Sequence, residues 1–301
     1  MNTNIYLTTL LAALLATFTP PGAYANPGDL YVTDNSSIRR YEPNGTEHVF
    51  STGLLRARGL AFDGTGNLFV ATLDTAIRGD NRGQILKFTP DGIATVFAAG
   101  AGLKSPEGLA FDGAGNLWVT SNYFSAGVFH APFGNPGPLA NAGEGRVTEI
   151  TPSGERTVLH LDPTTYHQNF GIAFDGQNNL GVADNLQSGI YKIAPDRRIT
   201  ILISASDPIG LAFDGTGNLL VSNIEGDITK IAPDGNQTLV VSGLGELRGL
   251  AIDKDCNIFA ASPFFAPDGD GHDVIYKILP DGSVSVFANG LDAPQFLAVE
   301  P

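Results

Sequence analysis

Several acidic and amide side chains recur at the ends of short apolar runs, where they can supply oxygen ligands. These residues are Glu107, Asn122, Asn169, Asp184, Asn185 and Asn223. Calcium takes roughly six to eight oxygen ligands in a flexible arrangement. The set therefore indicates a Ca²⁺ site, with Glu107, Asn169, Asp184 and Asn185 as the expected ligands. The alternative is that these side chains satisfy backbone groups at strand ends, as Asn and Asp often do.

Two arginines suggest a second kind of chemistry. Arg58 and Arg248 occupy equivalent places before two apolar runs, and Gln295 stands before a third. Planar guanidinium groups bond bidentately to carboxylate and phosphate groups. With Asn122 and Asn223, these residues predict a ligand site that favours an anionic small molecule. The open alternative is that each arginine pairs with a neighbouring Asp or Glu and stiffens the site.

Histidines supply the candidate acid–base groups. His167 and His272 lie in connections between runs, where an imidazole can transfer protons. The competing interpretation for either residue is a solvent-exposed loop histidine. The five histidines show no common spacing in the repeats, which makes zinc a less expected metal than calcium.

The elements that position these residues follow from an internal repeat. The pattern Gly-Leu-Ala-Phe-Asp-Gly-x-Gly-Asn-Leu starts at Gly59 and returns, with substitutions, at Gly108, Gly171, Gly210 and Gly249. Each copy contains two apolar runs joined by a turn. We expect the Asp-Gly pair to supply the left-handed residue of a tight hairpin turn. Asn178 replaces the second turn glycine in the third copy and tolerates that conformation, whereas Cys256 in the last copy predicts a different turn.

A second pair of apolar runs follows each copy, with Pro-Asp-Gly or a related turn between them. A unit is therefore four antiparallel strands without helical spacing, which predicts an all-β fold, a β-propeller. The residues 29–33 match the second strand of a unit, and the missing first strand appears at 295–300. The sequence thus predicts six blades, with the first blade closed by both termini.

The long insertions in the repeats all follow the second strand of a unit. They are Asp74–Arg82, Tyr123–Glu144 and Pro263–Asp273. In a propeller these connections share one face with the segments that precede each first strand. Loops that grow on one face of a regular scaffold usually carry its binding site, so we expect function on this face.

Over residues 28–300 the sequence resembles the NHL-repeat propellers and the senescence-marker-protein/gluconolactonase superfamily, on the repeated glycine and Pro-Asp-Gly elements. This resemblance implies a six-bladed propeller but says little about activity. Gluconolactonases are similar in placing Glu, Asn and Asp before first strands to hold Ca²⁺ or Zn²⁺. Glu107 matches that pattern and Asn169 matches it with a shift of one residue, but Ile209 stands where an acidic ligand is expected. The histidines show no repeat-phased spacing at the mouth, which argues against the histidine-dependent lyase chemistry of related propellers.

The first 25 residues predict a signal peptide, with an apolar segment at 5–18 and Ala23-Tyr24-Ala25 before the expected cleavage site. The mature domain is then 26–301, secreted or periplasmic, with no membrane insertion. The formal charge of −14 argues against a nucleic-acid partner. The single cysteine, Cys256, precludes an internal disulfide. We expect a monomer.

Two functional classes remain. The first is an exported propeller that binds a small molecule, glycan or protein on the insertion-bearing face without transforming it. The second is a metal-assisted hydrolase of the lactonase type, in which calcium polarises an ester carbonyl. The incomplete ligand set favours the first.

Overall fold

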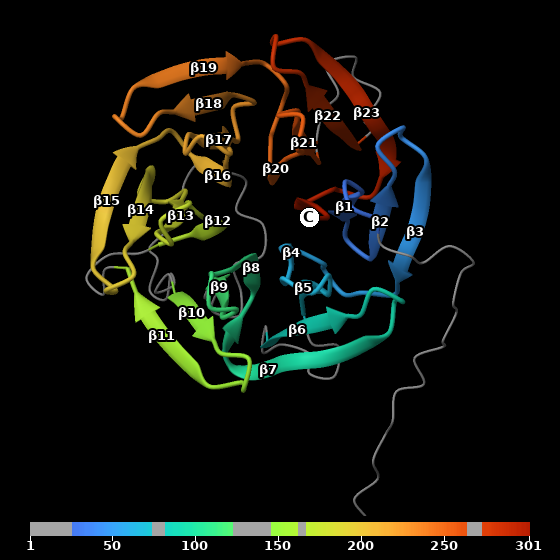
Figure 1. The fold of residues 1–301 in the computed structure, drawn as a ribbon, viewed down its shortest axis with the longest axis vertical. Coiled ribbons are helices and arrows are strands. Elements are labelled where there is room, and N and C mark those ends of the chain that lie inside the picture. The colour runs from blue at the N-terminus through green and yellow to red at the C-terminus, as the bar shows by residue number, and fades with distance from the viewer. Residues whose placement is uncertain (1–25, 74–81, 123–145, 162–166, 264–272) are drawn as a thin grey trace, which may run out of the picture.

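A computed structural model describes residues 26–73, 82–122, 146–161, 167–263 and 273–301. These residues form six four-stranded antiparallel sheets arranged around a central axis (Figure 1), which confirms the predicted β-propeller. No helix within the described ranges is long and apolar enough to cross a membrane.

Each blade is listed here from its innermost to its outermost strand. Blade 1 comprises β24 (Leu297–Val299), β1 (Leu30–Thr33), β2 (Ser37–Tyr41) and β3 (Glu47–Thr52). Blade 2 comprises β4 (Leu60–Phe62), β5 (Leu68–Leu73), β6 (Arg82–Phe88) and β7 (Ala94–Lys104). Blade 3 comprises β8 (Pro106–Phe111), β9 (Leu117–Ser121), β10 (Arg146–Ile150) and β11 (Arg156–His160). Blade 4 comprises β12 (Asn169–Phe174), β13 (Leu180–Asp184), β14 (Gly189–Ile193) and β15 (Ile199–Ser204). Blade 5 comprises β16 (Pro208–Phe213), β17 (Leu219–Asn223), β18 (Ile228–Ile231) and β19 (Gln237–Val241). Blade 6 comprises β20 (Leu250–Ile252), β21 (Ile258–Ser262), β22 (Asp273–Ile278) and β23 (Val284–Leu291).

Blade 1 is built from both ends of the described chain, as predicted. Strand β24 pairs antiparallel with β1, with Leu30 opposite Val299 and Val32 opposite Leu297. This pairing gives blade 1 its fourth strand, so all six blades have four strands and the ring is closed by the two ends of the chain. The core lies between adjacent blades, where the second strand of each blade is buried on both faces.

In blades 2 to 6, one aspartate fixes the turn after the inner strand. In blade 2 the Asp63 carboxylate accepts bonds from the Thr65 and Asn67 backbone N–H groups at 2.9 and 3.0 Å, and from the Asn67 amide at 2.8 Å. The left-handed residue is the one before the asparagine (φ 81° at Gly66), so the expectation that the Asp-Gly pair supplies it is wrong. Cys256 also adopts this conformation (φ 62°) and keeps the same turn hydrogen bond to Asp253, so the predicted change of turn is wrong as well.

Five glycines at the start of the inner strands let neighbouring blades approach backbone to backbone. A Cβ added at Gly108 would lie 2.3 Å from the Phe170 carbonyl oxygen of the next blade, and one added at Gly210 would lie 2.3 Å from that of Arg248. Side chains cannot occupy that space. The sixth position holds Phe296, whose side chain is directed into the channel.

The hydrogen bonds beside these glycines alternate around the ring. In odd-numbered blades a hydroxyl on the second strand relays the contact: Gly108 N–H donates to Thr120 Oγ1 (2.7 Å), which donates to the Phe170 carbonyl of blade 4 (2.7 Å). In blade 2, where Ala71 replaces the hydroxyl residue, Gly59 N–H donates directly to the carbonyl of the next blade (2.6 Å). The residues at this strand position, from blade 1 to blade 6, are Thr33, Ala71, Thr120, Ala183, Ser222 and Ala261.

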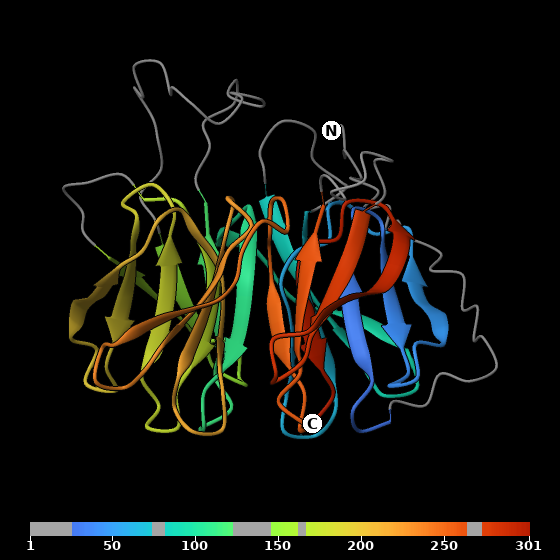
Figure 2. The same ribbon diagram turned by 90° about the horizontal axis from the view of Figure 1, so that it is seen from above.

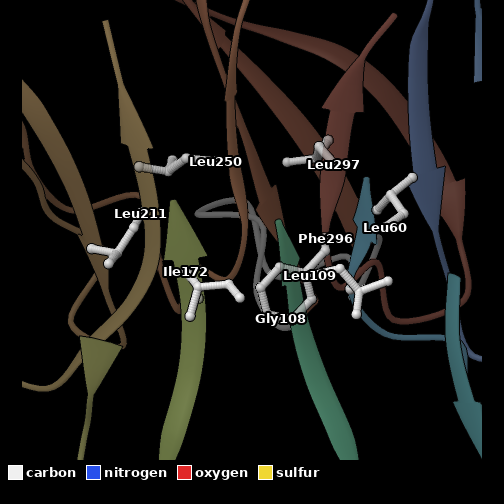
Figure 3. A pocket seen from close by; sticks show the side chains of 10 residues that line it. Leu60, Gly108, Leu109, Ile172, Leu211, Leu250, Phe296 and Leu297 are labelled. Carbon is white, nitrogen blue, oxygen red and sulfur yellow. The ribbon is translucent and has the colours of Figure 1, made fainter. Parts of the chain in front are cut away.

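The central channel is closed by apolar side chains. A cavity of about 60 Å³ is lined by Leu and Ile residues of the inner strands and by Phe296 (Figure 3). This volume holds only a few water molecules. A ligand larger than a few water molecules therefore does not fit inside the channel.

Candidate ligand-binding rim

The residue before the glycine position varies around the ring, with five residue types in six blades, and the six residues together form what we call the rim. In order from blade 1 to blade 6 they are Gln295, Arg58, Glu107, Phe170, Ile209 and Arg248. The inner strands run from the rim at the upper edge of Figure 2 toward their first turns at the lower edge. The rim thus lies at the mouth opposite the repeated turns, on the face where function is expected.

Glu107 and Arg58 form an ion pair at the rim. Arg58 Nε lies 3.5 Å from Glu107 Oε2, and both side chains are largely buried. Burial raises the pKa of the Glu107 carboxyl, while the charges of Arg58, Arg248 and Arg56 oppose that rise. Arg58 and Glu107, both predicted as site residues, therefore contact each other. This contact matches the alternative in which an arginine pairs with a neighbouring acid and stiffens the site.

Arg248 is buried between an acid and an aromatic ring. Its guanidinium pairs with Glu246, and its Cζ atom lies 5.7 Å from the centroid of the Phe170 ring, from blade 4. Burial lowers the pKa of Arg248; the Glu246 charge raises it and the Arg58 charge lowers it further. The charges of Arg58 and Arg248 therefore both reach the Glu107 carboxyl, although each arginine also pairs with an acid.

Arg56 is a third cation, next to the rim, that sequence reasoning missed. It lies two residues before Arg58 and close enough for the charges of Arg58 and Glu107 to affect it, and burial lowers its pKa. Its backbone is left-handed (φ 51°), as at Ser105 and Asp207, which hold the same place in blades 3 and 5. Alignment of the repeats two residues upstream of the inner strands would have identified the position.

Two amide side chains at the junction of blades 3 and 4 have polar atoms without a hydrogen-bond partner among the described residues. Asn169 is fully buried, and neither carboxamide atom has a hydrogen-bond partner among the described residues. Asn169 N–H donates to Asn122 Oδ1 at 2.9 Å, which leaves Asn122 Nδ2 without a partner in the same part of the chain. An unpaired buried amide is costly, so these groups are suited to a water molecule or a ligand hydroxyl.

His167 forms a buried pair with Asp184. Its Nδ1 bonds to Asp184 Oδ2, both side chains are fully buried, and the Tyr191 ring lies 5.5 Å from the imidazole. The exposed-loop interpretation of His167 is therefore wrong. Asp184 also accepts the Gln168 backbone N–H at 3.0 Å, so this dyad holds the connection that leads into β12. His272 lies outside the described residues.

The other predicted site residues make local bonds. Asn223 Oδ1 accepts backbone N–H groups of Glu225 and Asp227 at 3.1 and 2.8 Å, as the strand-end interpretation expects. Asn185 Nδ2 donates to Asp207 Oδ1 at 3.4 Å, and Gln295 Nε2 donates to the Ala293 carbonyl at 2.8 Å. None of these bonds brings the three residues to Glu107.

The predicted calcium ligands do not fit a metal centre well. Glu107 is paired with Arg58 and influenced by two more arginines, and Asp184 is paired with His167. Within the described ranges no three His, Cys, Asp or Glu side chains lie close enough to hold a metal ion. We derive no chemistry through a metal, and the calcium site stays a prediction.

No protein-family model matches the chain, and no curated protein sequence does. Solved structures share the fold. A virginiamycin B lyase from Staphylococcus aureus is 15% identical over 92% of this chain and 90% of its own, with a TM-score of 0.60. A gluconolactonase from Xanthomonas campestris is 20% identical over 80% of this chain and 85% of its own, with a TM-score of 0.60. A protein of unknown function from Bacteroides caccae is 15% identical over 92% and 100%, with a TM-score of 0.65. The chain therefore shares the six-bladed fold of lactonases and lyases, and this likeness shows the fold alone.

Proposed function

We propose that this chain is an exported binding protein that holds a small hydroxylated organic anion, such as a sugar acid, at the rim. The observation that carries the proposal is the gathering of Arg56, Arg58 and Arg248 around Glu107 at one mouth of the ring. Among the described residues, these three guanidinium groups share the mouth with the carboxylates of Glu107 and Glu246. This is a concentration of arginine at one place in a chain of formal charge −14.

A ligand carboxylate is the group that planar guanidinium side chains bind best. Charges elsewhere on the protein are screened within roughly 10 Å at ordinary salt, so the nearby arginines determine the local potential. The unpartnered amides of Asn122 and Asn169 provide donors and an acceptor that suit hydroxyl groups. The cavity of about 60 Å³ in the channel is too small for a sugar acid, so such a ligand stays at the mouth.

The test is a ligand screen by thermal shift with sugar acids, dicarboxylates and neutral sugars. For a carboxylate bonded to both arginines, Arg58→Ala and Arg248→Ala should each weaken binding by about 1.5–3 kcal/mol, the range for charge-assisted bonds. Arg→Lys should restore only part of it, because an ammonium group cannot bond bidentately. Arg198→Ala is the matched control, since Arg198 is exposed in an outer turn. Equal binding by wild type and the Arg58→Ala/Arg248→Ala double variant, or a preference for neutral sugars, contradicts the proposal.

A calcium-assisted lactone hydrolase is the second candidate. It is supported by the place of Glu107 before β8, by the unpartnered Asn169 amide, and by the shared fold of the gluconolactonase. Asp184 and Asn185 are the remaining expected ligands. Calcium at a hundred times its dissociation constant should add about 2.7 kcal/mol of stability by mass action, and Glu107→Gln should remove most of that gain. A melt that does not change between chelator and millimolar Ca²⁺ counts against this candidate.

We also propose export as a secreted or periplasmic monomer, with the predicted signal peptide 1–25 removed. The support is the apolar segment and the Ala-x-Ala triplet before Asn26. Amino-terminal sequencing of the exported protein should begin at Asn26, and its mass by light scattering should be that of one chain. Retention of residues 1–25 or a dimer mass would contradict these points.

A further inference from the structure

The seam that closes blade 1 contains a row of carboxyl groups. The register that places Leu30 between Val299 and Tyr41 also places Asp29 between Glu300 and Glu42. Backbone bonds confirm the end of this ladder: Gly28 N–H donates to the Glu300 carbonyl and Glu300 N–H to the Asp29 carbonyl, both at 2.9 Å. Residues directly opposite each other share a face of the sheet, and like charges in that position destabilise the pairing.

Two of these carboxyl groups are buried with little compensation. Asp29 is 1% exposed and Glu300 is 7% exposed. Asp29 Oδ2 and Glu300 Oε2 have no hydrogen-bond partner among the described residues, although Arg40 Nη1 approaches Asp29 Oδ2 to 3.4 Å. A buried charge that lacks a partner is costly, so two ionised carboxylates beside one guanidinium are unfavourable here.

We propose that this seam is a pH-sensitive latch: the Glu300 carboxyl carries a proton in the tightly closed ring, and its ionisation beside Asp29 loosens strand β24 from β1. The inference is independent of the ligand at the rim. Strand β24 ends at the opposite mouth, where the C-terminus lies at the lower edge of Figure 2. Loosening it weakens the inner edge of blade 1, whose Phe296 lines the channel.

Neighbouring groups leave the Glu300–Asp29 repulsion in place. On the same face, Glu42 pairs with His48 at 2.9 Å, and both are partly exposed. Among the described residues, Arg40 is thus the one cation that forms an ion pair with a buried acid of this seam, and His48 and Glu42 act on Asp29 only through their charges, with opposite signs. On β1, two residues after Asp29, the Tyr31 hydroxyl bonds to Arg40, and burial and the Glu300 charge raise the pKa of that hydroxyl. The rings that pack against Tyr31, those of Phe50 and Phe62, are apolar.

The direction of the pH effect follows from linkage. Burial and the Asp29 charge raise the pKa of Glu300 to about 7 from its usual 4.5, while Arg40 opposes the rise. Burial likewise raises the pKa of Asp29. Between pH 4.5 and about 7 the folded state therefore binds more protons than the unfolded state. The stability from the protonated seam is therefore complete below pH 4.5, falls as pH rises, and is lost above about 7.

The experiment measures melting temperature and amide exchange in the mature protein between about pH 5 and pH 8.5. The wild type should lose roughly 3–6 °C over this range. Exchange protection at Leu297–Val299, corrected for the intrinsic rate, should fall while that of Leu219–Asn223 in blade 5 stays constant. Glu300→Gln should remove most of both changes and melt higher than wild type at pH 8.5. Glu155→Gln, at an exposed turn of blade 3, is the matched control and should behave as wild type.

Two results would overturn the latch. One is constant protection of β24 in the wild type at both pH values. The other is an unchanged pH dependence in Glu300→Gln. If Glu300→Gln does not fold, Asp29→Asn gives the same test, because removing that charge should lower the pH dependence of β24 exchange; an unaltered dependence then rejects the proposal.

Discussion

The two ends of each inner strand follow opposite rules. At the turn end, five blades repeat one cage, in which an aspartate accepts bonds from backbone and side chain of an asparagine four residues later. At the rim end, six equivalent positions carry five residue types: Arg, Glu, Phe, Ile and Gln. The turn end must close a hairpin and tolerates little change. No hairpin has to be closed at the rim end, so its side chains are available for binding a ligand.

The inner-strand glycines lie between the variable rim and the repeated turns. Substituting one of them should have the largest effect among the variants that test this comparison. Gly108→Ala places a methyl group 2.3 Å from the Phe170 carbonyl and 3.1 Å from Thr120 Oγ1, so the blades must separate. We expect a loss of roughly 3 kcal/mol or more in unfolding free energy. Gly64→Ala is the control at the turn end, since no atom lies within 4 Å of the added Cβ. Similar denaturant midpoints for both variants would show that blade contact is looser than described.

Removing the one side chain at the glycine level tests the channel. Phe296→Ala deletes a ring that packs with Leu60, Phe170 and Ile209 and enlarges the existing cavity. We expect a loss of about 3 kcal/mol, in the range for buried phenylalanine. Small apolar solutes should bind in the enlarged cavity and raise the melting temperature of the variant. An unchanged unfolding free energy in Phe296→Ala would indicate that neighbouring side chains move into the space left by the ring.

The turn cages should respond to acid. Burial tends to raise the pKa of Asp214, but bonds from Asn218 and Thr216 outweigh it and lower that pKa. A lowered pKa gives stability that is present above the usual value of 3.8 and is lost as pH falls further. Asp214→Ala should cost about 1–2 kcal/mol at pH 6 and less at pH 3. Asp255→Ala, which removes only an exposed contact with Lys254, is the control. An equal cost at both pH values would contradict this account.

The smallest expected effect concerns the imperfect turn of blade 6. Cys256 is held at φ 62°, which costs an L-residue about 1–2 kcal/mol. Cys256→Gly relieves that strain but frees the unfolded chain, so we expect a net gain of roughly 0.5 kcal/mol. Gly66→Ala, at φ 81°, should lose stability by about 1 kcal/mol. A loss with Cys256→Gly would show that the thiol makes a stabilising contact.

The repeats made the fold predictable, because the same turn and glycine residues return at each blade. Closure of blade 1 was predictable too, since Gln295–Glu300 aligns with Arg248–Asp253. The site was less so. Repeat alignment placed Arg58, Glu107 and Arg248 at one mouth, but it could not show that Arg58 bonds to Glu107 or that His167 is buried against Asp184. Those contacts depend on side-chain directions between blades, which periodicity does not encode. The left-handed position was misassigned because both glycines of the turn permit it.

The alternating hydroxyl relay sets a counting rule for the ring. Its repeating module is a pair of blades, one with Thr or Ser and one with Ala at the same strand position. Adding or removing a single blade would bring two hydroxyl blades or two alanine blades together and break the alternation at that joint. Growth of such a ring by duplication should therefore proceed in steps of two, which makes the six-bladed molecule a trimer of doublets within one chain.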